Sequence, residues 1–227
     1  MTGVPVSIVI PALDEEATIA DVVRSALVHG GEVLVMDGGS RDRTRAEAET
    51  AGARVVFDGG GGKGAAIRAA AREASGEIIV FMDADGSHDA ADIPKLILPI
   101  AEGRADHVSG SRLLGGSSEL HGGFDEFLRL AGSAFITACI NRKFRVRLSD
   151  SQNGFRAIRR DLLSRMRLTS KGTTIEQEMI ARTLKLGGRM AEVPSHEGPR
   201  KAGSSHIDPV LDAPKYLLSL LKDVILA

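Results

Sequence analysis

Two aspartates with one small residue between them, Asp83 and Asp85, come directly after an apolar run. That run, Ile78–Met82, is short and rich in β-branched and aromatic residues, which is typical of a strand buried on both faces. At the carboxyl end of a parallel strand, the chain emerges where open α/β sheets bind ligands. Two neighbouring carboxylates repel each other unless a cation neutralises them. The pair therefore indicates a cation site at a ligand-binding edge, with an ordinary turn as the alternative.

A glycine-rich segment that contains one lysine, Gly59–Gly64, follows the third predicted strand. It includes the G-x-G-x-x-G pattern of dinucleotide-binding turns, with Asp83 at a suitable distance for a ribose-binding acid. In such folds, however, the pattern follows the first strand, and Lys63 followed by Gly64 does not complete a P-loop. We interpret the segment as a turn from which Lys63 reaches a phosphate, with a plain flexible loop as the alternative.

Positive charge is concentrated between residues 142 and 167, where nine lysines and arginines stand against two acids, Asp150 and Asp161. In a chain of balanced charge, this concentration indicates contact with phosphate groups or an anionic surface, with a solvated basic face as the alternative. Two further arginines, Arg112 and Arg200, each follow a predicted strand. If both strands end at the same edge, these arginines form a clamp for phosphate oxygens. Structural ion pairs are the alternative.

The elements that must position these residues alternate between strand-like and helical patterns. Apolar runs predict the strands Val6–Ile10, Glu32–Met36, Ala53–Phe57, Ile78–Met82, His107–Ser111 and Arg189–Val193. Helical spacing of apolar residues lies between them and predicts longer helices over 124–140 and 175–186. Strand–helix–strand units require right-handed crossovers and a parallel sheet. We therefore expect a single α/β domain with its strand-end turns at one edge, as a nucleotide site needs.

Composition limits the possible functions. The chain has 227 residues, enough for one α/β domain with a full core, and its formal net charge of −1 argues against a dedicated nucleic-acid-binding protein. The single cysteine, Cys139, excludes an internal disulfide framework and a cysteine-cluster metal site, and the histidines show no metal-ligand spacing. The amino terminus lacks the pattern of a signal peptide, and no segment reaches the apolar length of a membrane span. We expect a soluble or peripheral cytoplasmic protein.

Eight short motifs occur in one order: I-V-I-P-A-L-D-E-E, M-D-G-G-S-R-D-R-T, G-K-G, D-A-D-G-S-H, G-S-R, D-S-Q-N-G-F-R, I-E-Q-E-M and P-R-K-A-G-S-S. Together they resemble the family-two glycosyltransferases of the GT-A fold, and within that family the polyprenyl-phosphate hexosyltransferases of the dolichol-phosphate mannose synthase group. The resemblance runs from Val6 to Ile207. It implies a Rossmann-like, mostly parallel sheet flanked by helices. It also implies a metal-dependent, inverting transfer of a hexose from a nucleotide-diphosphate sugar to a polyprenyl phosphate of dolichyl or undecaprenyl type.

The same resemblance divides residues 1–207, the expected glycosyltransferase domain, and implies a role for individual residues. Residues 1–112 would form the nucleotide-sugar half and 113–207 the acceptor half, and the apolar pattern of residues 208–227 predicts a C-terminal amphipathic helix. The nucleotide sugar would be bound by Pro11, Ala12, Leu13, Glu15, Asp37, Lys63, Asp83, Ala84 and Asp85. The metal, Mg²⁺ or Mn²⁺, would be held by Asp85, Asp83 and Ser87. The acceptor would be bound by Arg112, Gly154, Phe155, Arg156, Arg200 and Ser204. The catalytic set would be Asp85, Arg112, Arg200 and Glu178.

Two positions depart from the mannose synthases, which carry an aromatic residue in place of Leu13 and an amide in place of Ser87. Without the aromatic ring, guanine is not assured and uracil is possible, so GDP- and UDP-hexoses are both candidate donors. Without the amide, a hydroxyl group or a water completes the metal shell. The sugar is left unassigned.

The chemistry of the acceptor can also be weighed. A hydroxyl acceptor needs a general base, whereas a lipid phosphate is already an anion and needs arginines to hold it in line. Arginines are abundant after Gly110 and no base dyad with histidine is evident, which favours a phosphate acceptor. A family-two enzyme with a hydroxyl acceptor, or a nucleotide-sugar-binding relative without turnover, remains the alternative. The apolar stretch Tyr216–Leu226 is too short to span a bilayer and is expected to dock on the core or to lie at a membrane surface.

Overall fold

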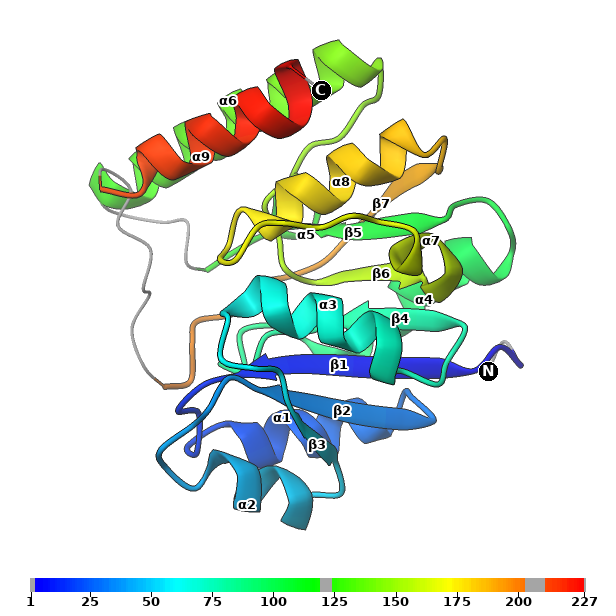
Figure 1. The fold of residues 1–227 in the computed structure, drawn as a ribbon, viewed down its shortest axis with the longest axis vertical. Coiled ribbons are helices and arrows are strands. Elements are labelled where there is room, and N and C mark those ends of the chain that lie inside the picture. Colours follow the sequence, from blue (N-terminus) through cyan, green and yellow to red (C-terminus); the bar gives the residue numbers. More distant parts are fainter. Residues whose placement is uncertain (1–2, 119–123, 203–210, 227) are drawn as a thin grey trace.

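The strands form one central sheet with the order β3-β2-β1-β4-β6-β5-β7 (Figure 1). This computed structural model describes residues 3–118, 124–202 and 211–226. The strands are β1 (Val6–Ala12), β2 (Glu32–Asp37), β3 (Arg54–Phe57), β4 (Ile78–Phe81), β5 (His107–Ser111), β6 (Arg156–Arg159) and β7 (Met190–Pro194). All neighbouring pairs are parallel except those that β6 makes with β4 and β5. The expected α/β fold with a mostly parallel sheet is therefore confirmed.

Helices cover both faces of this sheet. They are α1 (Ile19–Leu27), α2 (Thr44–Thr50), α3 (Lys63–Glu73), α4 (Ile93–Ala101, preceded by the 3₁₀ turn Ala90–Asp92), α5 (Arg112–Gly115), α6 (Phe124–Phe144), α7 (Arg160–Ser164), α8 (Ile175–Lys185) and α9 (Ala213–Leu220, continued by the π-turn Leu221–Ile225). Because side chains alternate along a strand, Ile8 and Ile10 of β1 pack against α1 and α4, whereas Val9 packs with α3, α7 and α8. The sheet is thus buried on both faces, as its continuous apolar strands require.

Strand β6 was not predicted from the sequence. Its four residues, Arg156–Arg159, lie within the arginine-rich segment, and they read as part of a basic surface. In the fold, Ala157 and Ile158 are completely buried between β4 and β5, with the other strands providing the apolar surroundings. Because β6 runs against its neighbours, the turn that precedes it, at Gly154, reaches the edge where the parallel strands end.

The C-terminal helix docks on the core, which was one of its two expected positions. Leu220 and Val224 are buried in an apolar cluster with Ile136 of α6 and Ile180 of α8, and Figure 1 shows α9 lying along α6. The opposite face of α9 is exposed, with Leu218 66% accessible. Within the described residues, no helix has the length and apolarity needed to cross a membrane.

Candidate active site

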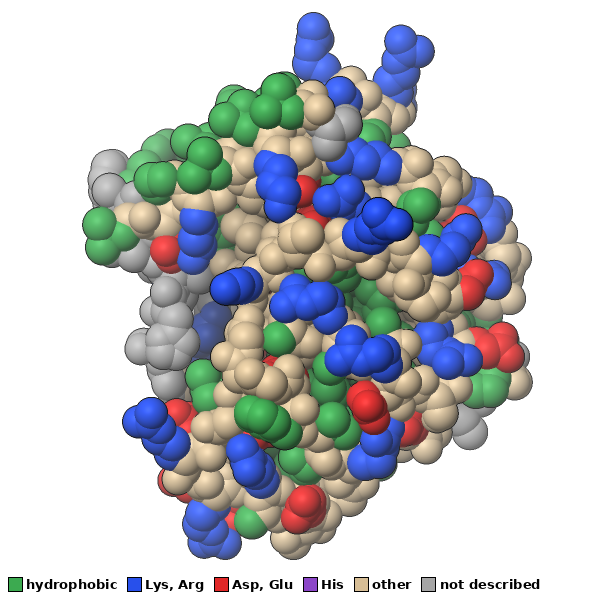
Figure 2. Space-filling view, viewed as in Figure 1, with side chains coloured by type: hydrophobic (Ala, Val, Ile, Leu, Met, Phe, Trp, Pro, Cys, Tyr) green, Lys and Arg blue, Asp and Glu red, His purple; other side chains and the backbone are tan. Residues whose placement is uncertain are grey.

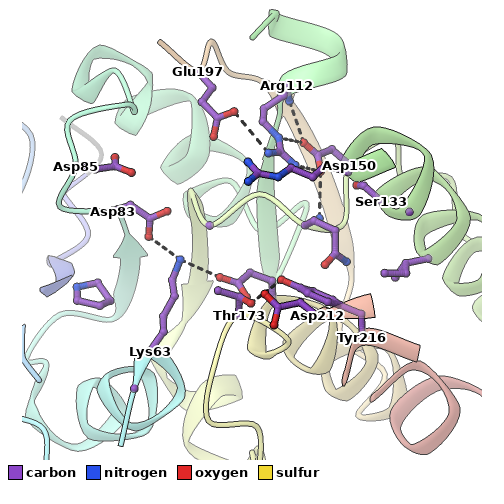
Figure 3. Close-up of a pocket in the computed structure, with 18 of the residues that line it drawn as sticks. Lys63, Asp83, Asp85, Arg112, Ser133, Asp150, Thr173, Glu197, Asp212 and Tyr216 are labelled. Atoms are coloured by element: carbon purple, nitrogen blue, oxygen red, sulfur yellow. Dashed lines mark hydrogen bonds and ion pairs between the residues drawn. The ribbon is translucent and has the colours of Figure 1, made fainter. Parts of the chain in front are cut away.

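A cavity of about 570 Å³ lies at the carboxyl edge of the sheet. The turns that follow β1, β2, β3 and β4 form one wall, and α6, α9 and the segment after β7 form the other (Figure 3). The wall at the sheet edge is strongly charged: eight carboxylates and four cationic side chains line the cavity as a whole. Between α6 and α9 the lining is mainly apolar, with Leu128, Phe135, Ile136 and Leu217, although Arg129 and Asp212 also lie there. The cavity therefore has a polar end and an apolar end.

Lys63 lies between two acids at the polar end. Its Nζ is 2.6 Å from Asp83 Oδ1 and 2.9 Å from Glu176 Oε1 (Figure 3). Burial alone would lower the pKa of Lys63, but the two carboxylates override it and raise this pKa. Burial would likewise raise the pKa of Asp83, but Lys63 and His88 hold it far below its usual range. Lys63 is therefore a permanent cation and Asp83 a permanent anion at neutral pH.

The turn before β6 closes tightly on this pair. A Cβ atom at Gly154 would lie 2.7 Å from Asp83 Oδ2 and 2.7 Å from Lys63 Nζ. Such distances are too short for real contacts, so only glycine lets the chain pass here without moving the ion pair. The backbone of this segment thus lies against the first acid of the Asp83–Asp85 turn.

Asp85 is almost fully buried and already has partners on both oxygens. Its Oδ1 accepts hydrogen bonds from the backbone N–H (3.0 Å) and hydroxyl (2.7 Å) of Ser87, and its Oδ2 is 3.0 Å from Arg200 Nη1. The Ser87 hydroxyl therefore orients Asp85. The backbone N–H of Lys201 donates to Asp85 O at 3.0 Å, which fixes the segment that carries Arg200 over the turn.

The acids of the Asp83–Asp85 turn are oxygen donors of the kind that bind a divalent cation. Asp83 and Asp85 both line the cavity, and over its whole lining carboxylates outnumber cationic side chains two to one. Among the described residues, no three His, Cys, Asp or Glu side chains gather as a metal cluster. Mg²⁺ sites that act on nucleotides commonly use only one or two carboxylates, with phosphate oxygens and waters as the other ligands. The two aspartates therefore fit a metal that arrives with a diphosphate.

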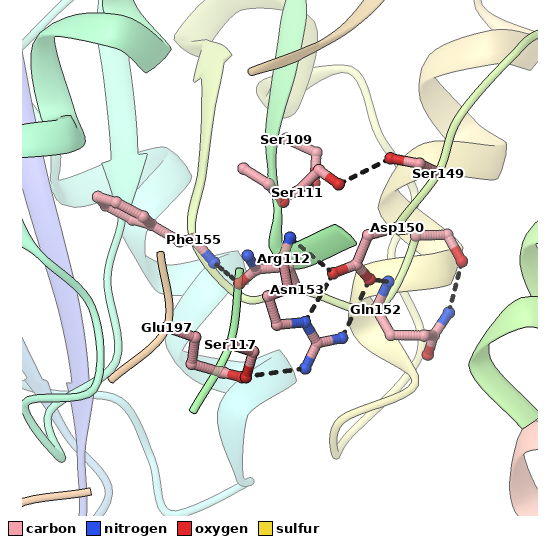
Figure 4. Close-up of polar contacts among 12 residues, drawn as sticks. Ser109, Ser111, Arg112, Ser117, Ser149, Asp150, Gln152, Asn153, Phe155 and Glu197 are labelled. Atoms are coloured by element: carbon pink, nitrogen blue, oxygen red, sulfur yellow. Dashed lines mark hydrogen bonds and ion pairs between the residues drawn. The ribbon is translucent and has the colours of Figure 1, made fainter. Parts of the chain in front are cut away.

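Arg112 is held by two acids on the other side of the cavity (Figure 4). Its Nε and Nη2 lie 2.6 Å and 3.0 Å from the two oxygens of Asp150, and Nη1 lies 3.5 Å from Glu197 Oε2. Burial would lower the pKa of Arg112, but these carboxylates raise it. Asp150 is only 2% exposed, and Arg112 lowers its pKa against the effect of burial. Both predicted clamp arginines, Arg112 and Arg200, thus line the same cavity, and in this structure each is paired with an acid.

The structure brings most of the predicted site residues together. The cavity is lined by Pro11, Ala12, Leu13, Glu15, Lys63, Asp83, Ala84, Asp85, Arg112, Gly154 and Arg200. Burial raises the pKa of Glu15, and the nearby Asp85 adds to this effect, so Glu15 lies within the field of the Asp83–Asp85 turn. Ser204 lies outside the described residues.

Other predicted residues lie behind the wall. The Asp37 carboxylate is completely buried and accepts hydrogen bonds from Gly39 N (3.0 Å) and Arg45 Nε (2.5 Å). The ring of Phe155 stacks on His88 at 4.8 Å between centroids. Arg156 is buried and donates to Glu176 O at 3.1 Å, and Glu178 accepts from Ser170 N at 2.8 Å. These contacts support the site, and direct contact of these side chains with a ligand stays a prediction.

Sequence reasoning gave no role to several residues that line the cavity: Asp58, Asp150, Thr173, Glu176, Glu197, Asp212 and Tyr216. On α8 the predicted site residue was Glu178, whereas Glu176 is the acid that contacts Lys63. Two residues apart on a helix, the two acids point to different sides. The packing of α8 against α3 determines which of the two acids faces Lys63, and the sequence motif alone does not specify this packing. The Tyr216 hydroxyl, 2.5 Å from Thr173 Oγ1, joins α9 to the cavity wall.

A mostly parallel sheet whose carboxyl edge presents an Asp-x-Asp turn and a lysine to one cavity is typical of glycosyltransferases of the GT-A fold. The model of glycosyl transferase family 2 matches residues 7–167, and the chain belongs to this family.

Three known proteins illustrate the similarity. The glycosyltransferase AglJ of Haloferax volcanii is 36% identical over 220 residues, which are 96% of this chain and 71% of that protein. The undecaprenyl-phosphate mannosyltransferase of Micrococcus luteus is 33% identical over 187 residues, 77% of this chain and 74% of that protein. Among solved structures, glucosyl-3-phosphoglycerate synthase of Mycobacterium tuberculosis, in complex with Mn²⁺, UDP-glucose and phosphoglyceric acid, superposes with a TM-score of 0.79 at 26% identity. That superposition covers 97% of this chain and 80% of the other.

Proposed function

We propose that the protein is a metal-dependent, inverting hexosyltransferase that moves a sugar from a nucleotide-diphosphate donor to a polyprenyl phosphate. The observation that carries the acceptor half of this proposal is the two-ended cavity. Its charged end at the Asp83–Asp85 turn suits a diphosphate and a metal, and its apolar end between α6 and α9 suits a hydrocarbon chain. The similarity to an undecaprenyl-phosphate mannosyltransferase supports the same acceptor class.

The donor would lie along the charged end. Cleavage of its sugar–phosphate bond develops negative charge on the leaving diphosphate, and Asp83 and Asp85 would hold Mg²⁺ or Mn²⁺, which would supply Lewis-acid stabilisation of that charge. Lys63 adds a second cation from the protein itself, and its raised pKa keeps it charged throughout. Asp83 and Glu176 hold the ammonium in place, which leaves it little freedom to reorganise during the reaction.

A phosphate acceptor also fits the ionisation of this site. Asp83 and Asp150 both have lowered pKa values, which makes these two acids poor bases for a hydroxyl proton. The acids of the cavity whose pKa values are raised, Glu15 and Asp58, belong to the turns after β1 and β3 that form the proposed donor side. A lipid phosphate is already ionised and needs orientation instead. Attack in line with the leaving group, from the side of Arg112 and Arg200, would invert the anomeric centre.

A hydroxyl acceptor is the second candidate, favoured by the similarity to an enzyme crystallised with phosphoglyceric acid. The purified protein, Mn²⁺ and a panel of UDP- and GDP-hexoses would be combined separately with polyprenyl phosphate, the matching free polyprenol and phosphoglyceric acid. We expect glycolipid only with polyprenyl phosphate. Transfer to phosphoglyceric acid or to the polyprenol would instead assign a hydroxyl acceptor, and donor binding without any transfer would indicate a binding protein.

The exposed face of α9 is the proposed contact with the membrane that carries the acceptor, on its cytoplasmic side. Leu218, Leu221, Ile225 and Leu226 are 66%, 44%, 46% and 80% accessible. In Figure 2, hydrophobic side chains gather over this helix with lysines and arginines around them. Exposed leucines flanked by cations are typical of helices that lie in the interface of an anionic bilayer.

We therefore expect the protein to float with anionic liposomes. Leu218→Glu combined with Leu221→Glu should lower the bound fraction several-fold without unfolding, because the buried face of α9, at Leu220 and Val224, is unchanged. The control is Leu98→Glu, which places one such charge at a leucine that, like Leu221, is 44% accessible but lies on α4. Equal flotation of all three proteins would remove α9 as the anchor.

A further inference from the structure

One acid of the cavity wall, Asp58, has no role in the chemistry described above. It follows β3 and lines the cavity with Leu13, Gly38 and Gly60. Its backbone N–H donates to Asp37 O at 3.0 Å, and its Oδ1 accepts from Gly60 N at 2.8 Å, so the carboxylate is fixed in direction. No described side chain forms an ion pair with it. The second carboxylate oxygen, Oδ2, is left for a ligand.

The surroundings of Asp58 favour a hydrogen-bond donor at its second carboxylate oxygen. Burial raises the pKa of Asp58 and the neighbouring Asp37 adds to the effect, whereas the hydrogen bond from Gly60 and the charge of Arg68 oppose it. A partly desolvated carboxylate is stabilised when a donor reaches it. The Asp37 carboxylate, in contrast, is completely buried and already bonded to Gly39, Ser40 and Arg45.

The backbone around Asp58 forms one end of the donor side of the cavity. A Cβ atom at Gly60 would lie 3.4 Å from Gly38 O, and one at Gly38 would lie 3.7 Å from Leu13 Cβ. The turns after β1, β2 and β3 therefore pass close to one another beside Asp58, and hydrogen bonds from Gly38 N to Ala12 O (2.9 Å) and from Asp58 N to Asp37 O (3.0 Å) join them. Lys63 follows in the same turn and marks the position of the diphosphate. The base of a nucleotide whose diphosphate lies at Lys63 would extend toward these turns, away from the apolar end of the cavity.

We propose that Asp58 selects the base of the donor by accepting a hydrogen bond from its ring N–H. Uracil N3–H and guanine N1–H are donors of this kind, whereas cytosine N3 and adenine N1 present a lone pair that a carboxylate repels. This inference rests on the proposed nucleotide-sugar donor and adds to it that CDP- and ADP-sugars bind more weakly, because the lone pair at their ring nitrogen repels Asp58 although their amino groups can donate to a carboxylate. The choice between uracil and guanine is left to the binding experiment.

Binding of free nucleotides tests the inference without turnover. The affinities of UDP, GDP, CDP and ADP are measured by calorimetry in the presence of Mn²⁺. We expect the wild-type protein to bind UDP or GDP at least about tenfold more tightly than CDP and ADP, about 1.4 kcal/mol. Methylation of the preferred base at its ring nitrogen, as N3-methyl-UDP or N1-methyl-GDP, removes the N–H donor. The wild-type protein should therefore bind the methylated nucleotide no more tightly than CDP or ADP.

Variants at Asp58 give the second arm. Asp58→Ala should lower the preference to within about threefold, and Asp58→Asn should improve CDP binding because an amide can donate to cytosine N3. The control Asp21→Asn removes one charge from the exposed surface of α1 and should change nothing. Unchanged preference in Asp58→Ala, or full binding of the methylated nucleotide, would overturn the inference while leaving the donor class intact. If the wild-type protein binds none of the four nucleotides, the proposed function itself fails.

Discussion

Asp85→Asn is expected to lower turnover by about 100-fold or more, and EDTA is expected to abolish it. The substitution removes one of the two carboxylates that fit a metal and a diphosphate. The expected loss is large because charged interactions in a site that excludes water contribute strongly to stabilisation of the transition state. Because the amide keeps the shape of the side chain, its contact with the Ser87 backbone can persist. The decisive readout is Mn²⁺ binding in the presence of a nucleoside diphosphate, measured directly by calorimetry, which should weaken in parallel with turnover.

The control for this variant is Asp89→Asn, which removes the same charge four residues away. Asp89 is exposed and caps a helical turn by accepting from Ala91 N at 2.9 Å, a contact that asparagine reproduces. A different result would follow if Asp85 served only as the partner of Arg200, 3.0 Å away. In that case Arg200→Gln would reproduce the loss and Mn²⁺ binding would stay unchanged in both variants. Full activity in EDTA would remove the metal from the mechanism altogether.

The residues at the ends of the parallel strands could be predicted from the sequence, because their position follows from local pattern. An apolar run such as Ile78–Met82 identifies a buried strand, and parallel strands end at a common edge. Local pattern therefore suffices to predict that four residues lie near one another, and all four line the cavity: Pro11, Lys63, Asp83 and Asp85.

The acceptor side depends on contacts between distant segments, and local pattern says little about these. Asp150 and Arg112 are 38 residues apart, and they meet because β6 inserts in reverse between β4 and β5. Nothing in the arginine-rich sequence of that strand marks it as central, since its burial comes from its neighbours. The contribution of α9 to the cavity likewise depends on docking through Leu220 and Val224, which a helical pattern permits but does not specify.

Arg112→Lys is expected to lower kcat/KM for the acceptor by about 10- to 100-fold, as expected for a lost charged hydrogen bond of roughly 1.5–3 kcal/mol. The guanidinium of Arg112 bonds both oxygens of Asp150 and also faces Glu197, so these two acids hold its plane in one position at the cavity lining (Figure 4). A lysine keeps the charge but cannot hold two oxygens in one plane. Donor affinity should change by less than about twofold, because Lys63 and the Asp83–Asp85 turn lie on the other wall. Hydrolysis of the donor by water should persist, since water needs no clamp.

The two acids that hold Arg112 also permit a purely structural role, and a matched variant separates the roles. Arg189 makes the same two-pronged bond with Asp106, at 2.9 Å and 3.1 Å, on the exposed surface before β7. Arg189→Lys therefore measures what the loss of the fork costs in folding alone, read as a change in melting temperature. If Arg112→Lys lowers melting temperature, donor binding and acceptor use together, Arg112 stabilises the fold and the proposed phosphate clamp is wrong. A selective loss in acceptor kinetics that Arg189→Lys does not show would indicate that the Arg112 guanidinium contacts the acceptor. If Arg112 only formed ion pairs with Asp150 and Glu197, its substitution would affect transfer to the acceptor and hydrolysis by water to the same extent.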